Sequence, residues 1–89
     1  MKIIQRTTQF KRDVKLIQKR GKSFNVFKQI IEDLMLGQAL APKYRDHILL
    51  GQYKGTRECY IEPDWLLIYE ATQDELILVR TGTHADLFK

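Results

Sequence analysis

The sequence predicts a small α+β domain in which an N-terminal strand and a hairpin of two helices pack on a small antiparallel sheet. Apolar residues recur at helical spacing up to residue 35, whereas from residue 56 onward they alternate or form continuous runs, as in strands. Glycine and proline residues separate these segments. Helices that cover one face of an antiparallel sheet form the usual two-layer arrangement of this class.

The first elements are a short strand and a helix. Ile3 and Ile4 are adjacent β-branched residues, which favour a strand at the start of the chain. Phe10, Val14 and Ile17 follow at positions i, i+4 and i+7, which places them on one face of a helix. Two threonines precede this stripe as candidate caps, and a glycine follows it where the helix should end.

A second helix is predicted shortly after the first. Ser23 is its candidate N-cap, and its apolar stripe consists of Phe24, Phe27, Ile31, Leu34 and Met35. Because only the segment Gly21-Lys22-Ser23 connects the two helices, we expect them to lie antiparallel as a hairpin. The basic residues fall mainly on the first helix, opposite its apolar stripe, so the hairpin should have a solvated basic face.

The second half of the chain predicts a three-strand meander. Residues 56–62 alternate between two faces, residues 65–69 are almost continuously apolar, and residues 75–80 form the next strand. We expect residues 38–51 to be a loop. The opening strand should join the sheet and cover one of its open edges.

Charge is unevenly distributed along the chain. The net charge is +4, from 15 Lys and Arg against 11 Asp and Glu. Residues 1–22 contain a single acid, Asp13, among the basic residues Lys2, Arg6, Lys11, Arg12, Lys15, Lys19, Arg20 and Lys22. This polarity favours a polyanion or an acidic partner on the basic side. The alternative from charge alone is an ordinary solvated helix face.

Size and composition limit the possible classes of protein. We expect residues 1–89 to form one domain, whose composition of 44% hydrophobic and 29% charged residues is typical of globular proteins. The chain has no apolar run long enough to span a bilayer, no signal-peptide pattern, and a single cysteine, Cys59. These features predict a cytoplasmic protein without disulfides. The sequence has neither a zinc-ligand spacing nor a glycine-rich phosphate loop, so we expect no metal and no cofactor.

Polar side chains should collect at one edge of the predicted sheet. The turn at Asp64 joins the first two strands of the meander, and the third strand leaves at the same edge, at Arg80. Glu62, Tyr60 and His84 lie close to these positions in sequence, so the five side chains can converge as a polar site. Each has an ordinary alternative role, as a turn residue, a strand end or a surface residue. Trp65 is more typical of a core residue than of a surface on which a nucleotide stacks.

Four blocks of sequence resemble one known family. They are HILLG at residues 47–51, KGTREC at 54–59, PDWLLIY at 63–69 and RTGTHADLF at 80–88. Together with the basic helical hairpin and the order of the strands, they resemble the YafQ-type branch of the RelE/ParE superfamily. The resemblance covers essentially the whole chain and implies a RelE-like fold.

The resemblance also implies a function. Such proteins are the toxins of bacterial type II toxin–antitoxin pairs. They are mRNA interferases, endoribonucleases that cut mRNA, typically in the decoding site of the ribosome. A cognate antitoxin protein holds each toxin inactive. The expected partners are therefore the antitoxin, mRNA and the ribosome, with no membrane and no small-molecule cofactor.

Family site residues match positions in this chain. The resemblance assigns the site histidine near the C-terminus to His84, the aspartate after proline to Asp64 and the histidine before the first long strand to His47. It also matches the site arginine to Arg80. Relatives often have a histidine where this chain has Tyr60, and the ordinary pKa of tyrosine, near ~10, makes it a poor base at neutral pH.

These residue types suit metal-free cleavage of RNA. We predict that His84 is the general acid and that Arg80 neutralises charge at the phosphate. Asp64 or His47 would take the 2′-proton, or orient the group that does. Aromatic side chains would stack an unpaired base and basic ones would hold phosphates; these predicted RNA-binding residues are Trp65, Phe88, Lys54 and Arg57.

Two alternatives remain open from the sequence. A ParE-like toxin shares the fold but poisons DNA gyrase by binding it, without an enzymatic reaction. It would not need the cluster of Asp64, Arg80 and His84, whose presence favours cleavage. A plain RNA-binding module would protect RNA without cutting it.

Overall fold

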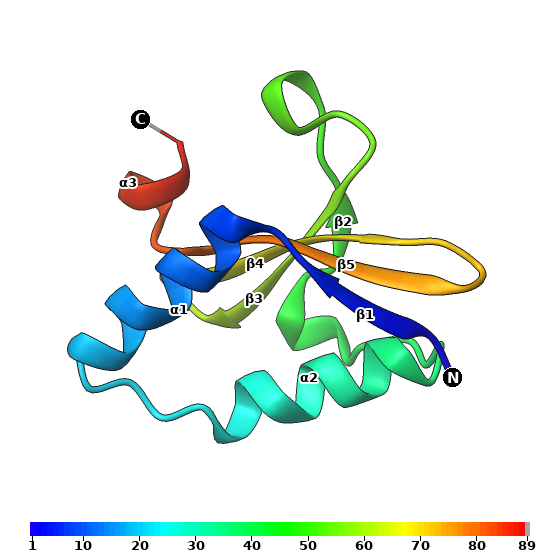
Figure 1. Ribbon diagram of the computed structural model, residues 1–89, viewed down its shortest axis with the longest axis horizontal. Coiled ribbons are helices and arrows are strands. Elements are labelled where there is room, and N and C mark those ends of the chain that lie inside the picture. Colours follow the sequence, from blue (N-terminus) through cyan, green and yellow to red (C-terminus); the bar gives the residue numbers. More distant parts are fainter. Residues whose placement is uncertain (89) are drawn as a thin grey trace.

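A five-stranded sheet with the order β1-β5-β4-β3-β2 organises the chain in the computed structural model, which describes residues 1–88 (Figure 1). The elements in chain order are β1 (Ile3–Arg6), α1 (Thr8–Lys19), α2 (Asn25–Met35), the 3₁₀ turn η1 (Pro42–Tyr44), β2 (His47–Ile48), the 3₁₀ turn η2 (Gly51–Tyr53), β3 (Arg57–Glu62), β4 (Trp65–Ala71), β5 (Glu75–Gly82) and α3 (His84–Leu87).

The predicted α+β class and meander are confirmed. Strands β3, β4 and β5 are neighbours and pair antiparallel through short turns. The opening strand does join the sheet, where β1 pairs parallel with β5 and occupies one edge. Helices α1 and α2 lie on one side of the sheet and run in roughly opposite directions, as expected for a hairpin (Figure 1).

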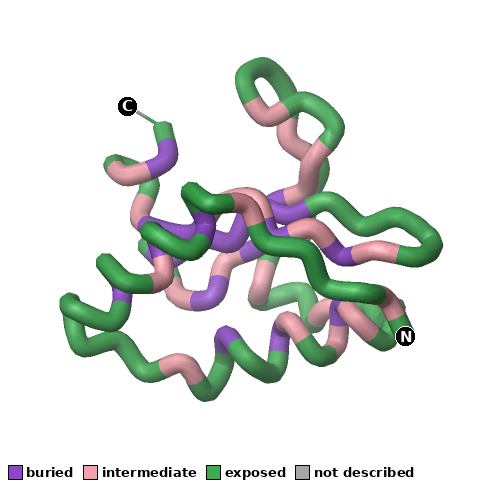
Figure 2. The backbone as a smooth tube through the Cα atoms, viewed as in Figure 1, coloured by how far each residue is buried: buried purple, intermediate pink, exposed green. Residues whose placement is uncertain are grey.

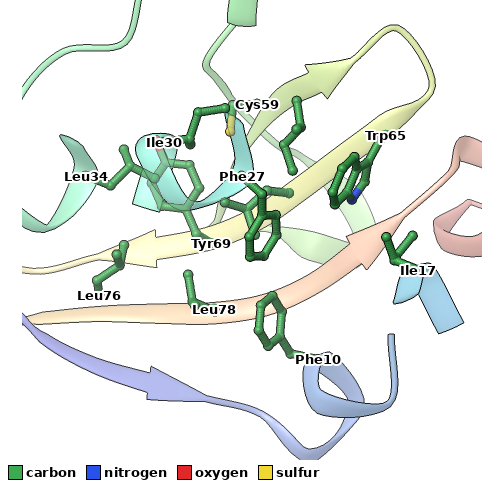
Figure 3. Close-up of a cluster of buried hydrophobic side chains, with 12 residues drawn as sticks. Phe10, Ile17, Phe27, Ile30, Leu34, Cys59, Trp65, Tyr69, Leu76 and Leu78 are labelled. Carbon is green, nitrogen blue, oxygen red and sulfur yellow. The ribbon is translucent and has the colours of Figure 1, made fainter. Parts of the chain in front are cut away.

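The core lies between the two helices and the sheet. Phe27 of α2 stacks on Trp65 of β4, with ring centroids 5.5 Å apart, and on Phe10 of α1 at 6.2 Å. Figure 3 shows these rings gathered with the aliphatic side chains of both layers. The buried residues of the sheet are concentrated in its central strands, whereas β1 and the turn between β4 and β5 are exposed (Figure 2). The helical stripes therefore bury the faces that their periodicity predicts.

The start of α2 differs from its prediction. The residue that precedes this helix is Phe24, which has no side-chain capping hydrogen bond, so the expected cap at Ser23 is wrong. Helix α1 begins as predicted, because the side chain of Thr7 accepts a hydrogen bond from the Phe10 amide at 2.9 Å.

Residues 38–51 contain more structure than the predicted loop. They hold η1 and the two-residue strand β2, in which His47 lies opposite Glu58 and Ile48 lies opposite Arg57 on β3. A two-residue strand carries no readable alternation, so only its pairing with β3 defines it. The pairing fixes His47 at the edge of the sheet.

The C-terminal segment contains more structure than the strand predicted for residues 75–80. Strand β5 runs on to Gly82, and α3 then begins at His84. Thr83 and Asp86 form a capping box, in which each side chain accepts a hydrogen bond from the other residue's backbone amide. Gly82 is needed here because a Cβ at this position would lie 2.9 Å from Asp86 Oδ2.

Among residues 1–88, every helix is too short or too polar to cross a membrane.

Candidate active site

The site lies on the face of the sheet opposite α1 and α2. Residues that pair directly across strands point to the same face. One row across β2, β3, β4 and β5 therefore consists of His47, Glu58, Ile68 and Arg80. A neighbouring row begins with Tyr60 on β3 and ends on β5 just before α3. The register thus brings three of the predicted catalytic positions, His47, Tyr60 and Arg80, to one surface, and α3 with His84 follows directly after the second row.

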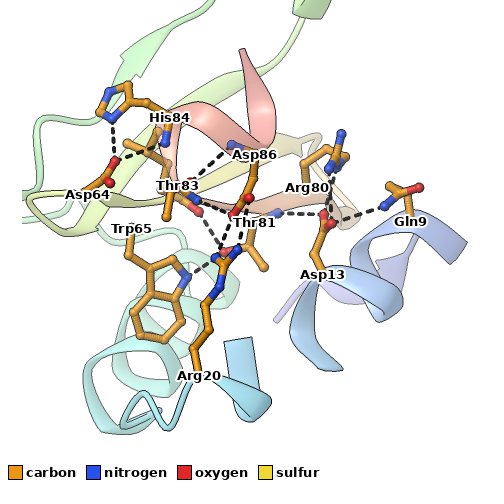
Figure 4. Close-up of polar contacts among 11 residues, drawn as sticks. Gln9, Asp13, Arg20, Asp64, Trp65, Arg80, Thr81, Thr83, His84 and Asp86 are labelled. Carbon is orange, nitrogen blue, oxygen red and sulfur yellow. Dashed lines mark hydrogen bonds and ion pairs between the residues drawn. The ribbon is translucent and has the colours of Figure 1, made fainter. Parts of the chain in front are cut away.

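His84 is held between a carboxylate and a phenol. Its Nδ1 lies 2.8 Å from Asp64 Oδ1, and its backbone amide donates to the same oxygen at 3.0 Å. Figure 4 shows both contacts crossing from α3 to the turn between β3 and β4. On the other side of the ring, Nε2 lies 3.1 Å from the hydroxyl of Tyr60. The predicted convergence of these three residues is observed in the structure.

The contacts of His84 determine which ring nitrogen can exchange a proton. Hydrogen bonds from the His84 backbone amide and then from its side chain lower the pKa of Asp64, so this carboxyl is ionised at neutral pH. An ionised carboxylate only accepts hydrogen bonds, and Nδ1 of His84 therefore carries a hydrogen. The nitrogen that can exchange a proton is therefore Nε2, which lies next to the Tyr60 hydroxyl on a half-exposed side chain. Its arrangement suits proton transfer to or from a bound substrate.

Arg80 lies at the other end of the row and is fixed by a buried acid. Its Nε donates to Asp13 Oδ2 at 2.8 Å and its Nη2 donates to Oδ1 at 3.1 Å. Asp13 also accepts from the Thr81 amide at 3.1 Å, as Figure 4 shows. The hydrogen bonds to Asp13 raise the pKa of Arg80 further. The third nitrogen, Nη1, lies 3.5 Å from the Tyr53 hydroxyl and remains directed toward the site face.

Asp13 is a functional residue that sequence reasoning missed. It is buried on α1, 67 positions before its partner Arg80 in the chain. The sequence contained one indication of this role: Asp13 is the only acidic residue among the basic residues of positions 1–22. A lone acid on the apolar side of a basic helix indicates a buried ion pair with an arginine elsewhere.

The prediction that Trp65 stacks an RNA base is wrong. Its side chain is only 1% exposed and lies in the core against Phe27. Its Nε1 donates to the Thr81 hydroxyl at 2.9 Å, which supports the strand that carries Arg80. A buried ring cannot present a face to a nucleotide, so Trp65 has a structural role, the alternative that its residue type favours.

Phe88 and Lys54 are exposed to solvent, whereas Arg57 forms an ion pair with Asp46. Phe88 is 40% exposed, and its ring lies 5.6 Å from that of Tyr53, edge to face. Lys54 is exposed just after η2. The Nε of Arg57 lies 3.1 Å from Asp46 Oδ1, at the edge of the sheet where β2 lies.

An open pocket adjoins the site at Tyr60. Its volume is about 430 Å³, and it lies between the start of α2, η1 and the turn between β3 and β4. The guanidinium of Arg45 lies over the Tyr60 ring, 5.9 Å from its centroid, and Arg45 has a left-handed backbone with φ of 49°. The pocket is lined by Val26, Lys43, Tyr44, Arg45, Tyr60, Ile61, Glu62 and Pro63.

Helix α3 is tied to α1 by a two-pronged ion pair. Arg20 Nη1 and Nη2 donate to the two oxygens of Asp86 at 2.7 and 3.1 Å. The hydrogen bond from Arg20 is the largest of the effects that hold the pKa of Asp86 well below its usual range. Because α3 carries His84, this ion pair and the capping box position the imidazole.

Asp86→Asn should weaken the response of folding stability to acid. A carboxyl whose pKa is lower in the folded state stabilises the fold above its unfolded pKa of about 3.9, and this contribution is lost as the pH falls through the folded value. Wild-type chain should therefore lose more unfolding free energy between pH 5 and pH 3, measured by urea titration, than Asp86→Asn. Asp74→Asn, at an exposed turn position, is the control and should keep the wild-type slope. Equal slopes for wild type and Asp86→Asn would contradict the role of this ion pair.

The chain matches a family of bacterial toxins. Residues 2–89 match the family model described as bacterial toxin of type II toxin-antitoxin system, YafQ. The mRNA interferase toxin YafQ of Escherichia coli K12 is 45% identical over 86 residues, which cover 96% of this chain and 94% of the relative. The crystal structure of YafQ from E. coli BL21(DE3) has a TM-score of 0.94 at 42% identity, with full coverage of both chains. A chain in the crystal structure of the E. coli DinJ–YafQ complex has a TM-score of 0.92 at 43% identity, again with full coverage.

Proposed function

Because the chain belongs to the YafQ family of bacterial type II toxin–antitoxin toxins, we propose that it is an endoribonuclease that cuts mRNA on the ribosome and so inhibits translation. The similar E. coli protein is named an mRNA interferase toxin. The observation that carries the proposal for this chain is the placement of His84 between Asp64 and Tyr60. A binding-only toxin has no need of an imidazole oriented in this way.

The reaction is an attack of the 2′-hydroxyl on the adjacent phosphate. The bond from O2′ to phosphorus forms, the bond from phosphorus to O5′ breaks, and the products carry a cyclic phosphate and a 5′-hydroxyl. One group must take the 2′-proton and another must protonate O5′. No water is consumed in this step, so the site needs only proton carriers and positive charge.

His84 is the general acid in this scheme. In its imidazolium form, His84 keeps the Nδ1 hydrogen on Asp64, while Nε2 delivers the second proton to the departing O5′ and the ring is left neutral. The hydroxyl of Tyr60, 3.1 Å from Nε2, orients this nitrogen before substrate binds. Since Tyr60 stands where relatives often have a histidine, we assign it a positioning contact and not a proton transfer at neutral pH.

Arg80 stabilises the negative charge that develops on the phosphate. Asp13 occupies its Nε and Nη2, which leaves Nη1 for a phosphate oxygen. A guanidinium held rigidly in advance needs little reorganisation during the reaction. The 2′-proton passes to one of two groups, Asp64 through its second oxygen or His47 at the start of the first row.

Binding of the strand uses exposed groups around these residues. Phe88 can stack an unpaired base, a contact worth about 1–3 kcal/mol. Lys54 and the partly exposed side chain of Arg57 can contact backbone phosphates. The exposed lysine and arginine side chains of α1 extend this basic surface. The pocket beside Tyr60 offers room for a neighbouring nucleotide.

The second partner is an antitoxin protein. The solved E. coli DinJ–YafQ complexes pair a similar toxin with another chain. The basic N-terminal part of this chain suits an acidic partner. We propose a cytoplasmic location, because the proposed substrate, translated mRNA, is found there.

Incubation with translating ribosomes tests the proposed function. We expect the purified chain to produce mRNA fragments with 5′-hydroxyl ends, mapped by primer extension, whereas DNA gyrase in a supercoiling assay stays active. Inhibition of gyrase without cut RNA would instead indicate a ParE-like toxin. Protection of RNA without new ends would indicate a plain binding module.

A further inference from the structure

Glu58 is a buried acid on the site face. It is 4% exposed, and its Oε2 is buried without a hydrogen-bond partner among the described residues. A carboxylate removed from water is costly unless a cation or hydrogen-bond donors compensate it. The proposed reaction does not use this residue, so its position needs another explanation.

The nearest titratable partner of Glu58 is His47. These residues lie opposite each other on β2 and β3, and His47 Nε2 is 3.3 Å from Glu58 Oε1. The other ring nitrogen, Nδ1, is 2.5 Å from the backbone oxygen of Arg45. Both nitrogens of His47 therefore face an oxygen that can accept a hydrogen bond. Both contacts are favourable at once only when each nitrogen carries a hydrogen.

We infer that Glu58 is a positioning residue that holds His47 as a fixed imidazolium, so that His47 supplies positive charge to the site and is not the general base. The inference rests on the proposed cleavage reaction and deepens it. Imidazole is more basic than a carboxylate, so the shared proton belongs on His47. A protonated Nε2 has no lone pair with which to accept the 2′-proton.

This assignment changes the division of roles within the site. With His47 excluded, the base is Asp64, whose Oδ1 orients His84 while its Oδ2 has no hydrogen bond from the residues that the structure describes. The imidazolium lies beside Tyr60, with ring centroids 6.4 Å apart, where its charge favours a bound phosphate.

Nitrogen NMR of the imidazole tests the inference without RNA. The chain has two histidines, so a His84→Gln variant assigns the signals of His47. At neutral pH we expect both ring nitrogens of His47 to have shifts of protonated nitrogen. Glu58→Gln should convert Nε2 to the unprotonated type, whereas Glu62→Gln, on the same strand but paired with Lys22, should change nothing. An unprotonated Nε2 in the wild-type chain, or no change in Glu58→Gln, would overturn the inference.

A double-mutant cycle tests whether Glu58 acts through His47. In the wild-type background, Glu58→Gln should slow single-turnover cleavage by roughly tenfold to a hundredfold, the scale expected for a misplaced catalytic group. In a His47→Ala background it should cause no further loss. Equal losses in both backgrounds would refute a role through His47, and melting temperatures establish that each variant is folded. If the wild-type chain cuts no RNA, the proposed function fails, and the NMR result still decides the state of His47.

Discussion

Replacement of His84 by alanine should lower the rate of mRNA cleavage by about 10²–10⁴-fold, the usual contribution of one general acid. The imidazole lies within hydrogen-bond distance of both Asp64 and Tyr60, so its loss removes the proton donor and the link between them. The measurement is single-turnover cleavage on ribosomes programmed with one mRNA. The fold should survive, because the side chain is half exposed.

Gln73→Ala is a suitable control for this experiment. Gln73 lies in the exposed turn between β4 and β5, away from the site, and its side chain can be removed without touching the proposed catalytic groups. This variant should cut at the wild-type rate. Undiminished cleavage by His84→Ala would remove His84 from the mechanism. Loss of cleavage together with loss of the melting transition would instead indicate a structural role.

Asp13→Ala should destabilise the fold by about 3 kcal/mol, the lower end of the cost of removing one partner of a buried ion pair. The change leaves the Arg80 guanidinium and the Thr81 amide without their acceptor. For a chain of this size, the loss corresponds to a fall in melting temperature of roughly 12–24 °C, measured by circular dichroism. Residual folded protein should also cleave more slowly, because Arg80 is no longer fixed.

Asp33→Ala is the matched control for Asp13→Ala. Both aspartates lie on helices and accept a hydrogen bond from a glutamine four residues earlier, at 3.2 Å from Gln9 and 3.0 Å from Gln29. Only Asp13 has the additional contacts with the last long strand. Asp33→Ala should therefore shift the melting temperature little. Similar shifts for the two variants would show that the helix contact, and not the ion pair, accounts for the effect.

Elements that bury a repeating apolar face could be predicted from the sequence. The stripes of α1 and α2 and the runs of β4 and β5 each span enough residues to establish a period. Strand β2 and helix α3 could not be predicted, because two and four residues establish none. Their structure depends on pairing with β3 and on the Thr83–Asp86 capping box.

Some residues of the candidate site could likewise be predicted from the sequence, and others could not. Asp64 and His84 lie at the ends of predicted strands, so topology and family resemblance both brought them together. Asp13 and Glu58 were missed because their partners are distant in sequence, and the only signal was the isolation of Asp13 among basic residues. Trp65 was predicted as an RNA contact alongside the family match, although its residue type favours the core position that it occupies.

The pairing of β1 with β5 has a consequence for the synthesis of the protein. The first strand finds its neighbour only in residues 75–78, and Asp13 finds Arg80 only after them. A nascent chain that ends before β5 therefore has an open sheet edge, an unpaired acid in its first helix and no His84. Such long-range closure is expected to be a late folding event. The active site therefore cannot form until β5 and α3 have been synthesised.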